Sequence, residues 1–133
     1  MWCYRTVMMT DNKLWKTTFW TLVLATLWLS LMPAEHIPST FNFWDKAQHA
    51  LGFAALAYCG LAGYARRTSR VVLGLVVFGM AIEVLQHLSG WRHGDWLDWV
   101  ADCAGLSLGW LVRAGSIRWT EQHINTSAAR QAK

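Results

Sequence analysis

Charged residues are scarce in this chain of 133 residues, and cysteine is scarcer still. Asp, Glu, Lys and Arg together make up 15% of the sequence, whereas a typical soluble domain carries about 25%. Hydrophobic residues make up 54%, which excludes an intrinsically disordered chain, because disorder requires low hydrophobicity and high charge. The three cysteines are too few, and odd in number, for a small fold held together by disulfide bonds.

Charge is missing locally as well, in four stretches that are nearly free of charged side chains. These stretches span about 14–32, 47–65, 71–91 and 96–112. A transmembrane helix needs roughly 20 mostly apolar residues to cross about 30 Å of hydrocarbon, so the pattern predicts an all-α, four-helix transmembrane bundle. A three-span alternative, in which the fourth stretch is re-entrant, stays open because two aspartates lie inside that stretch.

Helix breakers and polar segments separate the stretches. Pro33 and Pro38 follow the first stretch, and a polar segment at 66–70 lies between the second and the third. We expect one membrane domain over residues 1–118 with a retained first helix, rather than a cleaved signal peptide. The polar residues 119–133 are expected to form a disordered cytoplasmic tail.

The distribution of Lys and Arg predicts the topology. With four spans, both termini and the middle loop share one side, and ten of the twelve Lys and Arg residues fall there: Arg5, Lys13, Lys16, Arg66, Arg67, Arg70, Arg113, Arg118, Arg130 and Lys133. Because Lys and Arg are enriched in cytoplasmic loops, we expect a multi-pass protein of the bacterial inner (plasma) membrane with both termini cytoplasmic. The sequence has no basic face with interleaved aromatic residues, so we expect no binding to nucleic acid.

Polar residues recur near the outer ends of the spans. Asp98 and Asp102, like Asp45 and His49, are four positions apart and therefore share one helix face. An ionisable group that faced lipid would cost at least a few kcal/mol, so we expect these groups to point into the bundle. The candidate polar site comprises Asp45, Lys46, His49, Glu83, Gln86, Arg92, Asp95, Asp98 and Asp102.

Glycines continue the same faces toward the other side of the membrane. They are Gly52, Gly60 and Gly63 in the second stretch, Gly79 in the third, and Gly105 and Gly109, a GxxxG pair, in the fourth. Small residues allow membrane helices to approach closely. We therefore expect these glycines to lie at helix contacts, with the GxxxG pair packing either within the chain or against a second copy.

Motifs of known catalytic or metal sites are missing. The chain has no HExxH, no paired CxxC and no GxSxG. We therefore assign no metal site and expect no cofactor, although His49, Glu83, Asp98 and Asp102 carry nitrogen and oxygen donors of the kind that bind metals. A purely structural network of paired charges is the alternative interpretation of the polar cluster.

The polar residues form three spaced motifs: Asp45-Lys46-x-x-His49-x-x-x-Phe53, Glu83-x-x-Gln86 and Arg92-x-Gly94-Asp95-x-x-Asp98-x-x-x-Asp102-x-x-Gly105-x-x-x-Gly109. In order and spacing they resemble the VanZ-like family of membrane proteins, over about residues 42–112 and a matching leading span. Asp102 departs from the family pattern, where an asparagine is expected. The family's namesake is associated with low-level teicoplanin resistance, and the resemblance implies an integral membrane protein of the cell envelope without implying drug resistance.

Three functions are compatible with these observations. The first is an accessory membrane protein that binds, or acts on, envelope lipid or precursor headgroups, with Lys46, His49 and Arg92 holding a phosphate. The second is a structural or partner-binding subunit, including a homo-oligomer formed through the fourth helix. The third is a lipid-phosphate hydrolase or transferase, in which His49 or Glu83 acts as general acid or base.

Overall fold

A computed structural model describes residues 2–32, 42–90 and 94–131 of the chain. The side chains of 2–12 and 42–45, and of scattered positions after residue 120, lie outside this description. The described residues form four α-helices and a 3-10 helix, without strands: α1 (Trp2–Leu31), α2 (Asn42–Gly63), η2 (Ala65–Arg67), α3 (Thr68–Ser89) and α4 (Trp96–Gln131). The prediction of an all-α fold with four helices is therefore confirmed.

The helices end where the local sequence disfavours further helix. α1 ends at Leu31, two residues before Pro33, because proline disfavours the helical conformation of the residue before it. α3 ends at Ser89, and Gly90 follows it with a φ of 78°. This left-handed conformation is a common helix terminator, and glycine adopts it without a steric penalty.

Two helices are longer than the apolar stretches predicted. α1 begins at Trp2, and α4 continues to Gln131, through the segment for which we expected a disordered tail. No proline follows Pro38 to interrupt α4. Hydroxyl groups of Thr120 and Ser127 instead donate hydrogen bonds to carbonyl groups four residues earlier in the helix.

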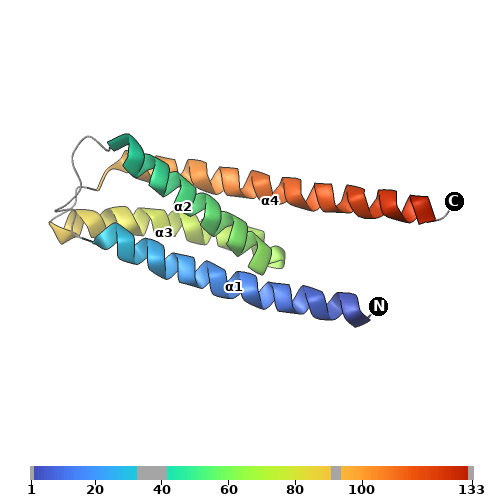
Figure 1. Cartoon of the computed structure of the whole chain (residues 1–133). Helices are drawn as coiled ribbons and strands as arrows, with labels where there is room; N and C mark the ends of the chain where they lie inside the picture. Colours follow the sequence, from blue (N-terminus) through green and yellow to red (C-terminus); the bar gives the residue numbers. More distant parts are fainter. Residues whose placement is uncertain (1, 33–41, 91–93, 132–133) are drawn as a thin grey trace.

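The helices lie side by side, and their ends gather at two ends of a bundle (Figure 1). α1 and α3 finish, and α2 and α4 begin, at one end; both chain termini extend from the other. Within the bundle α2 packs most extensively against α4 and next against α1. We call the end at which α2 and α4 begin the polar end, because it carries most of the candidate site.

The GxxxG pair of α4 packs against α2 of the same chain. A side chain at Gly105 would overlap the backbone carbonyl of Ala50, and one at Gly109 would overlap the carbonyl of Ala54. Because both obstacles are backbone atoms, only glycine permits this separation of the two helices. The choice left open by the sequence is thus decided in favour of packing within the chain.

The other predicted packing glycines differ in their surroundings. A Cβ atom at Gly60 would lie 2.8 Å from a methyl group of Val71, and one at Gly63 would lie 3.1 Å from the backbone nitrogen of Lys16. These two glycines therefore hold α2 close to α3 and α1. The space beside Gly52, by contrast, is open.

The buried core is small, and much apolar surface is exposed. The core consists of Phe19, Phe53, Leu56, Ala57, Cys59, Leu75, Ile82 and Leu106. Large apolar side chains are exposed on all four helices, among them Trp28 at 71% and Leu88 at 74%. Exposed apolar surface on this scale marks a contact with membrane or with other proteins.

One segment in the described part of the chain is long and apolar enough to cross a bilayer by length and composition. It is Ala65–Ser89, with a mean hydropathy of 2.0 over its most apolar part. The other helices combine apolar residues with tryptophan, threonine and charged side chains, which lower their hydropathy.

Candidate functional site

Three helices bring six of the nine predicted site residues together at the polar end. Lys46 and His49 come from the first turns of α2, and Glu83 comes from the last turns of α3. Asp95 immediately precedes α4, and Asp98 and Asp102 follow in its first two turns. Hydrogen bonds between these side chains, or to the backbone, connect all three helices.

Asp95 takes part in two of these four hydrogen bonds. Its backbone N–H donates a hydrogen bond to Glu83 Oε2 at 2.9 Å. Its Oδ1 accepts a hydrogen bond from the backbone N–H of Leu97 at 3.0 Å, so Asp95 is the N-cap of α4 and satisfies one of the helix's free N–H groups. Its Oδ2 accepts a hydrogen bond from Lys46 Nζ at 2.9 Å. Asp95 therefore fixes the start of α4 against both α2 and α3.

The Lys46 ammonium lies between two carboxylates. Besides Asp95 it contacts Asp98 Oδ1 at 2.6 Å. The hydrogen bonds to Asp95 and then Asp98 raise the pKa of Lys46 above its ordinary value. The hydrogen bond from Lys46, and to a smaller extent the one from the backbone N–H of Leu97, lowers the pKa of Asp95 below its ordinary value. Both groups are therefore charged at neutral pH, and Lys46 is already neutralised by protein carboxylates.

Removal of the Lys46 charge is expected to shift the titration of Asp95. The pair contributes stability above the ordinary pKa of Asp95, and this contribution is lost as pH falls through the lowered pKa. In Lys46→Met the pKa of Asp95 should rise toward its ordinary value, measured from the carboxyl chemical shift in an NMR titration. Lys13→Met, in the N-terminal half of α1 and away from the polar end, should leave it unchanged. An unaltered Asp95 titration in Lys46→Met would contradict the contact.

His49 and Asp102 form a buried pair between α2 and α4. His49 Nδ1 lies 3.0 Å from Asp102 Oδ1, and Asp102 is 1% exposed. The carboxylate fixes the orientation of the imidazole ring, as carboxylates do for histidines that bind metals or transfer protons.

Two carboxylate oxygens in the cluster are buried without a hydrogen-bond partner among the described residues. They are Oε1 of Glu83 and Oδ2 of Asp102. Asp102 Oδ2 faces Gly79 of α3, where a Cβ atom would lie 2.8 Å away. Donor atoms of His49, Glu83 and Asp102 all lie within 4.8 Å of one another. This trio of residues carries one nitrogen and two carboxylate donors of the kind that hold a metal ion.

Gln86 lies on α3 near the cluster but makes its contact elsewhere. Its Nε2 donates a hydrogen bond to the backbone carbonyl of Ser30 at 2.9 Å, which ties α3 to the last turn of α1. Asp45 lies in the first turn of α2, but its side chain is outside the described residues, as is all of Arg92. The structure therefore describes neither contribution to the site.

Three residues outside the predicted set make contacts between helices near the cluster. Gly94 lies against the backbone carbonyl of Glu83, so close that a side chain there would collide with it. Ser30 accepts the hydrogen bond of Gln86, and Trp99 Nε1 donates one to the carbonyl of Val76 at 3.3 Å. The sequence pointed to Gly94 and Trp99 by position, because Gly94 directly precedes Asp95 and Trp99 lies between Asp98 and Asp102. The role of Ser30 depends on tertiary contact alone.

The described part of the polar end is acidic. Four carboxyl groups lie there, those of Glu83, Asp95, Asp98 and Asp102, and the single ammonium among the residues that the structure describes, that of Lys46, contacts Asp95 and Asp98 alone. Such a site attracts cations more readily than free anions. We therefore expect a phosphate to bind here only together with a positive charge that these groups do not supply.

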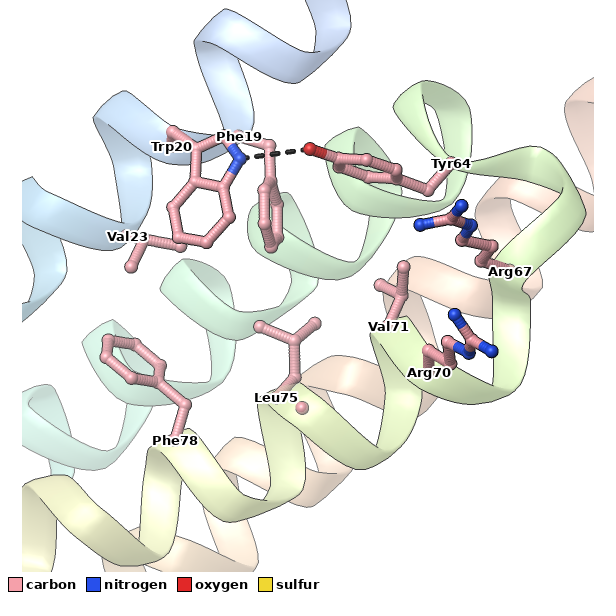
Figure 2. A pocket seen from close by; sticks show the side chains of 10 residues that line it. Phe19, Trp20, Val23, Tyr64, Arg67, Arg70, Val71, Leu75 and Phe78 are labelled. Atoms are coloured by element: carbon pink, nitrogen blue, oxygen red, sulfur yellow. Dashed lines mark hydrogen bonds between the residues drawn. The ribbon is translucent and has the colours of Figure 1, made fainter.

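A cavity of about 460 Å³ lies at the opposite end of the bundle, between α1, α3 and the turn that connects α2 to α3. Its walls are mainly apolar, with Phe19, Leu75 and Phe78 pointing into it, while Arg67 and Arg70 lie at the turn into α3 (Figure 2). The indole N–H of Trp20 donates a hydrogen bond to the Tyr64 hydroxyl at 3.0 Å across one side of it. This cavity is separate from the polar end.

Comparison of the chain with models of protein families, with curated proteins and with solved structures finds no match.

Proposed function

We propose that the chain is a multi-pass membrane protein of the cell envelope, with both termini cytoplasmic, whose polar end binds headgroups of envelope lipids or their precursors. The observation that carries this proposal is the convergence of ionisable side chains from α2, α3 and α4 at one end of a bundle whose helices otherwise expose apolar side chains. The resemblance of these motifs to the VanZ-like family supports the same proposal.

The distribution of apolar surface supports contact with lipid. Side chains such as Leu73, Val77 and Leu88 are exposed along α3, and Leu108 and Leu111 are exposed along α4. Contact with hydrocarbon would remove this surface from water, with a gain of about 25 cal/mol per Å². The buried polar groups lie instead where the helices meet, as expected for ionisable residues of membrane bundles.

The arrangement of the termini supports the topology. Both chain ends extend from the end of the bundle opposite the polar end, together with the arginines at the turn from α2 to α3. Because Lys and Arg favour the cytoplasmic side, this arrangement would place the polar end at the outer face. Headgroups of the outer leaflet, and precursors exported to it, would then be within reach.

A second candidate function rests on the His49–Asp102 pair. A carboxylate that orients an imidazole ring is the usual arrangement behind a general acid or base. In a lipid-phosphate hydrolase or transferase, His49 would transfer the proton and Asp102 would hold the ring in place. Asp98 takes no part in this pair, because it binds Lys46.

The proposal is tested on membranes that contain the full chain. We expect alkaline carbonate to leave the chain in the membrane fraction, because spanning helices resist such extraction. After mild detergent extraction, native mass spectrometry should show retained phospholipid. Asp98→Asn should raise this lipid occupancy at least threefold, because it removes one of the two carboxylates that neutralise Lys46 and leaves the ammonium free to bind a headgroup phosphate.

The matched control makes the same change at the other end of the same helix. Glu121→Gln lies in the C-terminal half of α4, far from the polar end, and should retain lipid as the unaltered chain does. Release of the chain by carbonate would refute the membrane location. Equal lipid occupancy in the unaltered chain and Asp98→Asn would refute headgroup binding at the polar end.

A further inference from the structure

We infer that His49, Glu83 and Asp102 bind one divalent transition-metal ion, of the class of Zn²⁺ and Mn²⁺, at the polar end. The inference deepens the proposed function, because the ion would supply the positive charge that a headgroup phosphate requires. The role of the ion in the cell therefore rests on the proposed function. The binding of the ion itself rests on the geometry of the three side chains.

The three residues come from three different helices and meet at one place. Their donor atoms lie within 4.8 Å of one another, and His49 Nδ1 and Asp102 Oδ1 are 3.0 Å apart. In a metal shell with bonds of about 2.1 Å, neighbouring ligand atoms are about 3–3.4 Å apart. Side-chain movements of about 1 Å would therefore bring the three donor atoms to the separations of metal ligands without moving a helix.

The buried carboxylates provide an independent observation that points to a cation. Asp102 is 1% exposed, and its Oδ2 has no hydrogen-bond partner in the described part of the chain; the same holds for Oε1 of Glu83. Buried charges are normally paired or coordinate a metal, because an uncompensated charge is costly away from water. Lys46 does not compensate the charge of these two carboxylates, since its ammonium contacts Asp95 and Asp98.

The surroundings keep the donor atoms in place. The backbone N–H of Asp95 holds Oε2 of Glu83, so that Oε1 is directed away from it. Gly79 lies where a side chain would meet Asp102 Oδ2. Such contacts beyond the metal ligands orient carboxylates and histidines in known metal sites.

The donor set determines the class of metal. One imidazole nitrogen with two carboxylate oxygens suits Zn²⁺ and Mn²⁺ and leaves coordination positions open. Mg²⁺ requires near-ideal octahedral oxygen coordination, and Ca²⁺ takes six to eight oxygens. An ion with open positions can accept an oxygen of a headgroup phosphate, or of a water molecule.

The test uses the full chain, purified in detergent, stripped with EDTA and freed of added lipid. Titration with ZnCl₂ or MnCl₂ alone, followed by calorimetry and elemental analysis, should show one ion per chain. Glu83→Gln and Asp102→Asn should each weaken the binding at least tenfold. Glu121→Gln, the same kind of change on the C-terminal half of α4, should leave it unaltered. MgCl₂ should bind at least tenfold more weakly than ZnCl₂.

A second measurement covers the case in which a variant does not fold. CoCl₂ added to the unaltered chain should produce the visible absorption of Co²⁺ in a nitrogen–oxygen site, and ZnCl₂ should raise the melting temperature. Absence of stoichiometric Zn²⁺ and Mn²⁺ binding would overturn the inference. So would an affinity of Glu83→Gln and Asp102→Asn for these ions equal to that of the unaltered chain. Metal binding without any retained phospholipid would support the metal site and refute the headgroup function.

Discussion

Gly105→Ala is expected to lower the free energy of unfolding by about 1–3 kcal/mol, although it adds only a methyl group. The new Cβ would overlap the backbone carbonyl of Ala50. A backbone atom within a helix is unable to rotate away, so α2 and α4 would have to separate along their most extensive contact. The free energy of unfolding, measured by helical circular dichroism during titration with SDS, tests this expectation.

Gly115→Ala on the same helix is the matched control. Beyond its chain neighbours and the nearby backbone of its own helix, no atom in the described part of the chain lies within 4 Å of the position that its Cβ would occupy, and alanine is favoured over glycine in a helix by up to about 1 kcal/mol. The same chemical change should therefore stabilise the chain at Gly115 and destabilise it at Gly105. Equal effects at both positions would show that Gly105 does not hold α4 against α2.

His49→Ala is expected to have the second large effect, a loss of about 3 kcal/mol or more in the free energy of unfolding. Removing one partner of a buried pair leaves the other charge uncompensated, and such losses are typically 3–5 kcal/mol. Here Asp102, 1% exposed, would lose the contact of its Oδ1 while its Oδ2 already lacks a partner among the described residues. Chemical or SDS unfolding of the metal-free chain measures the effect.

Two further variants separate the pair from a general loss of a histidine. His87→Ala changes an exposed histidine of α3 and should alter stability by no more than about 0.5 kcal/mol. The double variant His49→Ala/Asp102→Ala should be less destabilised than the sum of its single variants, because it removes the stranded carboxylate. Strict additivity would mean that the two side chains do not interact.

The spacing of the polar residues indicated that most of the candidate side chains lie at the same end of the bundle. Four-residue intervals put Asp98 and Asp102 on one face of α4, and the order of the segments puts the start of α2, the end of α3 and the start of α4 at the same level. The observed contacts of Lys46, His49 and Glu83 with the aspartates follow this arrangement.

The partners within the cluster were not predictable in the same way. We expected Lys46 to hold a phosphate, yet its ammonium is bound by Asp95 and Asp98. Gln86 was placed in the cluster by its helical position, and it contacts Ser30 of α1 instead. A helical repeat specifies the face on which a side chain lies, whereas its partner depends on how far each helix is rotated and shifted against its neighbours.

The sequence by itself determined the class of the fold, the number of helices and the concentration of ionisable groups at one end, because these depend on local composition and on helical periodicity. Only the tertiary structure decided that Gly105 and Gly109 pack within the chain and that two buried carboxylates face His49. The physical reason is distance: helix separation and the geometry of buried charges are set by contacts between residues about fifty positions apart, which no local pattern encodes.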